Sequence, residues 1–136
     1  MAAVAIDLDG VLGDTSGLWD AWLEDVSRRA QIDPDRLDEQ LPNWQQLLER
    51  FAEDHAPVYL RPSSGATSAL RALQADGVTI GVFTDRPAVL AQVAIAHLGA
   101  SRRIAHLEAG PGSLERLLAL LGPDARVART LAELGA

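Results

Sequence analysis

A short uncharged segment at residues 3–6 runs directly into Asp7-Leu8-Asp9-Gly10. Its small and β-branched residues are typical of a buried strand that is covered on both faces of a parallel sheet. Gly10 permits an abrupt turn, so Asp7 and Asp9 leave the end of the strand together. Ligands bind at the carboxyl ends of strands in open parallel sheets, so this segment predicts an α/β fold with an acidic site at one sheet edge.

A second apolar run at residues 78–83 predicts another buried strand, and Thr84 stands at its end. Asp85-Arg86-Pro87 follows and is typical of a helix start, with Pro in the first turn. Two interpretations stay open. The Thr84 hydroxyl donates a hydrogen bond to a bound anion, or Thr84 or Asp85 caps the next helix.

The rest of the chain alternates between helix and strand signals, with Ser63 or Ser64 as a helix cap and Thr130 before a short terminal helix. We expect helices at 64–76, 87–98 and 112–121 and strands at 103–106 and 126–128. With right-handed crossovers this order predicts a three-layer α/β/α, Rossmann-like parallel sheet. Asp7, Asp9 and Thr84 should then meet at one edge.

The pattern Asp-Leu-Asp-Gly-Val-Leu at residues 7–12, with Asp14-Thr15 close behind and Thr84 after the second strand, resembles the haloacid dehalogenase (HAD)-like hydrolase superfamily. The resemblance implies a phosphatase in which Asp7 is the nucleophile and Asp9 the general acid and base. It also implies Mg²⁺ held by the carboxylate of Asp7 and the main-chain carbonyl of Asp9, with a substrate phosphate bound near the residues that follow the two strands. Those candidates are Gly10, Thr84, Asp85 and Arg86.

Two later motifs depart from the superfamily. A Lys or Arg is expected just before a Pro-containing helix start, but the chain contains no Lys, and Ala109 and Gly110 precede Pro111. The nearest basic residues are Arg102, Arg103 and Arg116. Arg129 stands after the last expected strand, where a metal-binding Asp is expected. A guanidinium cannot ligate magnesium, so Arg129 either pairs with Asp7 or a phosphate, or it leans into solvent.

Two hypotheses therefore remain. One is a phosphohydrolase with a loosened magnesium site that Asp85, Glu108 or Glu133 completes through water. The other is a catalytically inactive relative, a pseudoenzyme, that binds a phosphorylated ligand or a protein partner. The complete first motif favours the first hypothesis, and Arg129 favours the second.

Residues 15–60 contain five of the six aromatic residues and have helical apolar spacing. This insert resembles the small helical cap of many superfamily members, which implies a cap at residues 15–60 and an α/β core formed by residues 1–14 and 61–136. The aromatic stripes serve mainly as core, although Trp19 is a candidate for the edge of the site.

Net charge and composition narrow the choice of partners. The net charge of −7 argues against binding to nucleic acids and anionic membranes. The apolar N-terminal stretch ends at Asp7 and is too short to span a bilayer. The chain contains no Cys, which is compatible with the cytoplasm. We expect a cytoplasmic monomer or homodimer that binds a small phosphorylated molecule.

Overall fold

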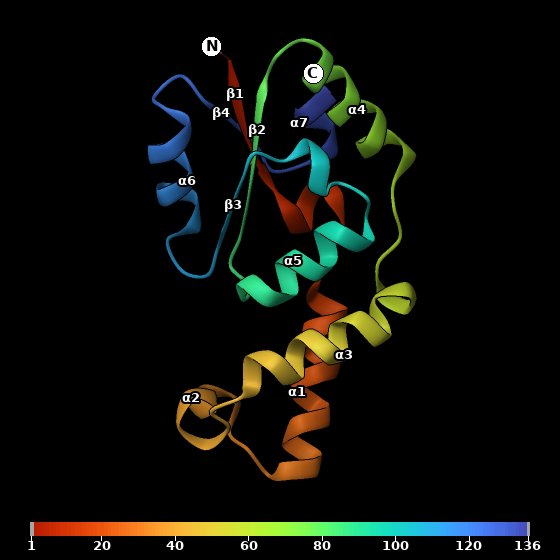
Figure 1. The fold of residues 1–136 in the computed structure, drawn as a ribbon, viewed down its shortest axis with the longest axis vertical. Helices are drawn as coiled ribbons and strands as arrows, with labels where there is room; N and C mark the ends of the chain where they lie inside the picture. The colour runs from red at the N-terminus through yellow and green to blue at the C-terminus, as the bar shows by residue number, and fades with distance from the viewer. Residues whose placement is uncertain (1, 136) are drawn as a thin grey trace.

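The computed structural model describes residues 2–135, apart from the side chains of residues 30 and 135. Its centre is a four-stranded parallel sheet with the strand order β3-β2-β1-β4 (Figure 1). The strands are β1 (Ala3–Asp7), β2 (Thr79–Thr84), β3 (His106–Ala109) and β4 (Arg126–Ala128). In the register of the sheet, Asp7 lies beside Phe83 and Ile6 lies beside Ala128, so the carboxyl ends of β1, β2 and β4 meet at one edge.

Helices cover both faces of this sheet (Figure 1). The helix α6 (Ser113–Leu121) packs its Leu117 against Ala5 and Phe83 on one face. The other face carries α4 (Ser64–Ala75), α5 (Ala88–His97) and α7 (Leu131–Gly135). The predicted three-layer α/β/α fold is therefore confirmed.

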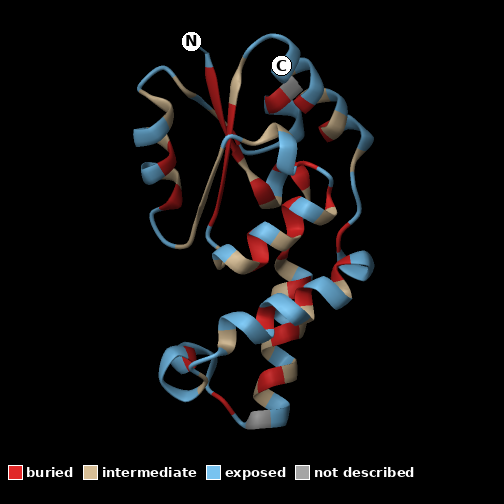
Figure 2. Ribbon diagram, in the orientation of Figure 1, coloured by how far each residue is buried: buried red, intermediate tan, exposed pale blue. Residues whose placement is uncertain are grey.

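The central strand has the burial that its composition predicts. Val4, Ala5 and Ile6 are all fully buried, which requires cover on both faces of the sheet. Figure 2 shows this buried strand and the buried stripes of the helices that face it.

The third strand was predicted too early in the chain. Residues 101–103 form a 3-10 turn, in which the backbone N–H of Arg103 donates to the carbonyl of Ala100 at 3.0 Å. The strand begins at His106, and Leu107 pairs with Val82. Of the expected strand, Arg103 lies in this turn and His106 is the first residue of β3, while the Ala105 N–H already donates to the Ile80 carbonyl at 2.8 Å.

Between β1 and α4 the chain forms a helical insert that extends from one end of the sheet (Figure 1). It contains the π-helical turn η1 (Leu8–Leu12), α1 (Ser16–Ala30), the 3-10 turn η2 (Pro34–Arg36), α2 (Leu37–Gln40) and α3 (Trp44–Tyr59). Trp22 is almost fully buried, with its ring centroid 5.6 Å from that of Trp19 and 6.1 Å from that of Trp44. The aromatic stripe is thus core, as predicted.

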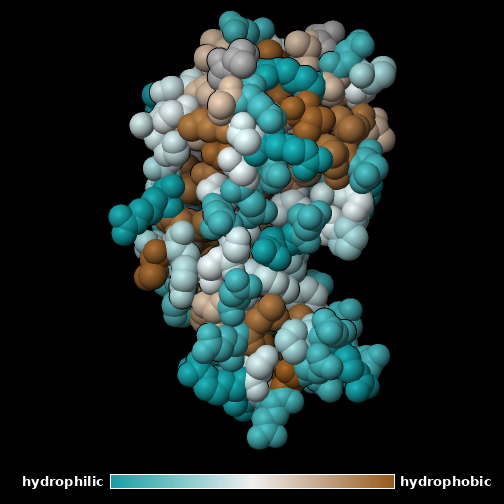
Figure 3. All heavy atoms as spheres, turned by 180° about the vertical axis from the view of Figure 1, so that it is seen from behind, coloured by the Kyte–Doolittle hydropathy of each residue, from teal (hydrophilic) through white to brown (hydrophobic). Residues whose placement is uncertain are grey.

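The surface is hollowed between the insert and the part that contains the sheet (Figure 3). Helix α3 contacts α5, and α1 contacts α3, so the insert is joined to the α5 face of the sheet. None of the helices described is long and apolar enough to cross a membrane.

Candidate active site

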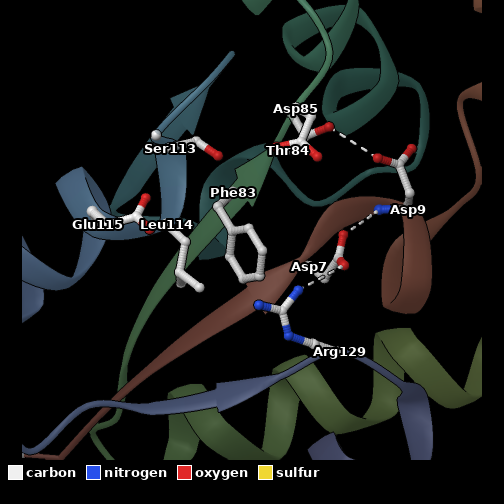
Figure 4. Close-up of a pocket in the computed structure, with 10 residues that line it drawn as sticks. Asp7, Asp9, Phe83, Thr84, Asp85, Ser113, Leu114, Glu115 and Arg129 are labelled. Atoms are coloured by element: carbon white, nitrogen blue, oxygen red, sulfur yellow. Dashed lines mark hydrogen bonds and ion pairs between the residues drawn. The ribbon is translucent and has the colours of Figure 1, made fainter.

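A pocket of about 460 Å³ opens at the carboxyl edge of β1 and β2 (Figure 4). Its walls come from β1 and its following turn, the end of β2, the start of α6, and the segment after β4. The lining residues are Asp7, Asp9, Phe83, Thr84, Asp85, Gly112, Ser113, Leu114, Glu115 and Arg129. Of the site residues predicted from the sequence, the pocket brings together Asp7, Asp9, Thr84 and Asp85.

The turn after β1 sets the two aspartates beside each other. The backbone N–H of Asp9 donates to Oδ1 of Asp7 at 3.2 Å. The same turn is closed by a hydrogen bond from the Gly13 N–H to the Leu8 carbonyl at 3.1 Å. This spacing across five residues is that of a π-helical turn, a geometry that is frequent at functional sites.

Three hydrogen-bond donors hold the Asp9 side chain. Oδ1 accepts from the Thr15 N–H at 2.9 Å and from the Thr15 hydroxyl at 2.5 Å. Oδ2 accepts from the Thr84 hydroxyl at 2.9 Å. Thr15 is fully buried, so this anchor does not compete with water. Asp9 is therefore fixed as an acceptor in the structure.

The prediction that Thr84 or Asp85 caps the next helix is wrong, because α5 begins after Pro87 and no side chain caps it. The Thr84 hydroxyl donates to Asp9 at 2.9 Å and accepts from the Arg86 N–H at 3.2 Å. It therefore steadies the turn after β2 and also positions a carboxylate of the pocket. A hydrogen bond from Thr84 to a phosphoryl oxygen stays a prediction.

Arg129 points into the site (Figure 4). Its Nη1 lies 3.9 Å from Oδ2 of Asp7, and its guanidinium carbon lies 5.5 Å from the centroid of the Phe83 ring. Its backbone N–H donates to Oε2 of Glu133 at 2.8 Å. Of the two interpretations left open by the sequence, the geometry favours pairing with Asp7.

Gly10 and Arg86 lie close to the site without lining the pocket. A Cβ on Gly10 would overlap the carbonyl oxygen of Arg129 and lie 3.2 Å from its carbonyl carbon. Gly10 is thus needed for the close approach of two backbone segments. The guanidinium carbon of Arg86 lies 6.0 Å from the ring centroid of Trp19, on the insert. Roles for Gly10 and Arg86 in binding phosphate stay predictions.

Three other candidates, Arg116, Glu108 and Glu133, are engaged elsewhere. Arg116 donates to Oε1 of Glu108 at 2.9 Å and to the carbonyls of Ala109 and Pro111, both at 2.6 Å. It ties the β3–α6 loop together and does not line the pocket. Glu133 accepts from the Arg129 N–H. Glu108 and Glu133 are therefore poorly placed to complete a metal site.

The donor set does not fit magnesium. Mg²⁺ requires near-octahedral oxygen ligands, commonly including one or two carboxylates. In the part of the chain that the structure describes, no group of three or more His, Cys, Asp or Glu residues is placed to hold a metal ion. A guanidinium also stands beside the Asp7 carboxylate, with Nη1 of Arg129 at 3.9 Å from Oδ2. Magnesium binding by Asp7 and Asp9 stays a prediction that these contacts do not favour.

Burial and crowding shift the pKa of Asp7. Partial burial raises the pKa of its carboxyl, and the charge of Asp9 raises it further. Hydrogen bonds from the Asp9 and Gly10 amides and the charge of Arg129 lower it, but the net shift is upward. The pocket lining described contains the carboxylates of Asp7, Asp9, Asp85 and Glu115 against the single guanidinium of Arg129. The excess of carboxylates in the described lining therefore opposes the entry of an anionic ligand, except beside Arg129.

Several lining residues were missed by sequence reasoning. Phe83 precedes Thr84 and forms a wall of the pocket, while Ser113 and Glu115 come from the first turn of α6. Ser113 is 2 % exposed, and its hydroxyl points into the pocket (Figure 4). The available signal was the predicted helix start after the third strand, which lies at the same sheet edge.

Comparison with known proteins identifies the fold. No protein-family model matches the chain, and no curated protein matches it. The structure resembles a protein described as "putative beta-phosphoglucomutase" from Thermotoga maritima, with a TM-score of 0.59 and 22 % identity over 99 % of this chain and 80 % of that one. It also resembles a HAD-superfamily hydrolase from Ehrlichia chaffeensis, with a TM-score of 0.53 and 16 % identity over 98 % and 82 % of the two chains. This chain has a HAD-like hydrolase fold, as the sequence resemblance predicted.

Proposed function

We propose that this protein hydrolyses a phosphate monoester of a small molecule, with Asp7 as the nucleophile. The observation that carries the proposal is the placement of Asp7 and Asp9 together at the end of the central strand, with Asp9 anchored by Thr84 from the neighbouring strand. One similar structure is described as a "putative beta-phosphoglucomutase", which supports chemistry at phosphorus, and the other as a hydrolase, which supports hydrolysis.

The reaction has two steps. A carboxylate oxygen of Asp7 attacks phosphorus, the bond from phosphorus to the ester oxygen breaks, and a proton from Asp9 neutralises the leaving alkoxide. Water then attacks the aspartyl-phosphate, Asp9 takes a proton from it, and inorganic phosphate and the Asp7 carboxylate are released. For the first step, Asp9 must be protonated and must exchange its threonine donors for the leaving oxygen.

Neutral donors for the phosphoryl oxygens stand on two sides of the pocket. Thr84 ends β2, and Ser113 begins α6. The Ser113 hydroxyl points into the pocket (Figure 4). Neutral donors can stabilise a transferring phosphoryl group without adding to the carboxylate charge.

The pocket and the insert indicate the class of substrate. A volume of about 460 Å³ suits a small phosphorylated metabolite. The net charge of −7 is unfavourable for nucleic acids. We assign residues 15–60 as a cap over the core formed by 1–14 and 61–136, and such a cap excludes water from the reacting groups.

A second candidate function is the binding of a phosphorylated ligand without turnover. The three donors that fix Asp9, and the guanidinium beside Asp7, favour it. A protein of this kind retains the acidic pair to shape the site and needs no proton transfer.

Hydrolysis of a generic aryl phosphate tests the proposal, measured with and without Mg²⁺ for the parent chain and for Asp7→Asn. Asp76→Asn is the matched control, because Asp76 is exposed and precedes β2 at the opposite end of that strand. Turnover by the parent and by the control, lost in Asp7→Asn, would support the proposal. Absence of turnover by the parent over a panel of phosphate monoesters, together with measurable binding of inorganic phosphate, would replace it with the binding function.

A further inference from the structure

We propose, resting on the function above, that the guanidinium of Arg129 takes the place of a divalent cation, so that the pocket binds phosphate without magnesium. The residue that breaks the expected metal site would thus be the residue that holds the ligand.

The backbone of Arg129 is anchored on both sides. Its N–H donates to the Glu133 carboxylate at 2.8 Å, and its carbonyl packs against Gly10, where a side chain would not fit. Glu133 is itself fixed, because its N–H donates to the Thr130 hydroxyl at 3.2 Å. Arg129 therefore starts from a defined point on the wall of the pocket rather than from a loose loop.

The Arg129 side chain has defined neighbours, but its guanidinium donors form no hydrogen bond with the residues described. It lies over the ring of Phe83 at 5.5 Å and reaches to 3.9 Å from Asp7. A distance of 3.9 Å is too long for a hydrogen bond, and none of the residues described accepts one from the guanidinium. The side chain is 58 % exposed. Its planar set of donors is therefore available for two phosphoryl oxygens.

Charge makes this assignment specific to Arg129. It is the cation among the described lining residues, against four carboxylates. Arg116 is bound to the β3–α6 loop and Arg86 lies over Trp19, so neither of these neighbours supplies the missing charge. A phosphate that enters the pocket beside Asp7 has to meet Arg129.

The Arg129 guanidinium opposes a metal ion at the same place, although the four carboxylates of the described lining favour a cation. An ion bound to Asp7 would lie close to the guanidinium, and like charges at such distances repel strongly in a partly buried site. The third acidic ligand is also missing from the described residues. The same substitution thus removes a metal ligand and supplies a replacement for the metal charge.

Calorimetric titration with inorganic phosphate tests the first half of the proposal. The parent should bind phosphate with the same Kd in MgCl₂ and in EDTA. Arg129→Gln should weaken binding by about tenfold or more, since charge-assisted hydrogen bonds are lost. Arg129→Lys should lie between them, because it keeps the charge and loses the planar fork. Arg102→Gln is the matched control, because Arg102 is exposed and lies outside the pocket.

Manganese as a spectroscopic probe tests the second half. We expect no Mn²⁺ relaxation signal from the parent and a signal from Arg129→Asp, whose phosphate binding should then require the metal. Thermal melts of all variants check folding. If the carboxylate added in Arg129→Asp prevents folding, the Mn²⁺ measurement is made on Arg129→Gln, which removes the guanidinium without adding a charge.

The outcomes separate this proposal from the function on which it rests. Phosphate binding or hydrolysis by the parent that requires Mg²⁺ would overturn the role of Arg129 and leave the hydrolase intact. Unchanged phosphate affinity in Arg129→Gln would do the same. If the parent neither binds phosphate nor hydrolyses the aryl phosphate, with or without Mg²⁺, both the role of Arg129 and the hydrolase function would be overturned.

Discussion

Replacement of Gly10 by Ala should displace the segment that carries Arg129. The added Cβ would overlap the Arg129 carbonyl oxygen and lie 3.2 Å from the carbonyl carbon. Both are backbone atoms, so relief requires movement of the turn after β1 or of the segment after β4. Rotation of a side chain cannot provide it.

The expected cost follows from the kind of contact. Overpacking against a well-packed neighbour costs about 1–3 kcal/mol. For a domain of this size each kcal/mol lowers the melting temperature by about 3–6 °C, so we expect a fall of roughly 3–18 °C. Displacement of Arg129 should also weaken phosphate binding, so Gly10→Ala should lower both the melting temperature and the affinity for phosphate.

Thermal unfolding followed by circular dichroism measures the effect, with Gly17→Ala as the matched control. A Cβ on Gly17 would lie 3.0 Å from the ring of Tyr59, and that residue is 40 % exposed and can move away. Gly17 also lies within α1, where Ala is favoured over Gly by about 0.5–1 kcal/mol. If Gly10→Ala melts at the temperature of the parent, the close approach of the two backbones is not a constraint and the reasoning fails.

Three further predictions concern stability. Thr15→Val should cost about 1–3 kcal/mol in urea unfolding because Asp9 loses a buried hydroxyl donor, whereas Thr79→Val should change little; equal losses would contradict the specific role of Thr15. Burial raises the pKa of Asp7, so the folded state binds its proton more tightly than the unfolded state, and Asp7 lowers stability as pH rises from its ordinary pKa through the raised value. Asp7→Asn should therefore gain stability at neutral pH relative to the parent and lose little at acidic pH, and a pH-independent difference in urea unfolding would count against it. Trp22→Ala should cost about 3–5 kcal/mol, because the ring is buried between two other tryptophans, whereas the partly exposed Trp44 should cost less when replaced by Ala; the two urea midpoints compare them directly.

The strands at the centre of the sheet were predictable because cover on both faces leaves an uncharged run. Residues 3–6 and 78–83 have such runs, and both are strands. The edge strand β3 lacks one, since all of His106–Ala109 is only half-buried and includes a charged Glu108. Its weak pattern could not be separated from the turn that precedes it.

The pocket was predictable to the extent that it follows from strand ends. Asp7, Asp9, Thr84 and Asp85 come directly after β1 and β2 or stand at their ends, and parallel strands bring these positions together. The direction of an individual side chain depends on its tertiary neighbours. Arg86 is next to Asp85 in sequence but turns to Trp19 on the insert. Sequence proximity to a site residue was therefore insufficient.

The substitution at residue 129 separates geometry from charge. The sheet brings the end of β4 to the end of β1, so Arg129 stands beside Asp7, where the sequence resemblance implies an acid. What changes is the balance of charge around Asp7, and through it the chemistry that the pocket allows. On the proposals above, binding of phosphate needs the Arg129 guanidinium to be available, whereas hydrolysis also needs Asp9 to leave Thr15 and Thr84 and to carry a proton. On the same proposals, release of Asp9 from its donors, rather than the presence of the acidic pair, distinguishes an enzyme from a binding protein.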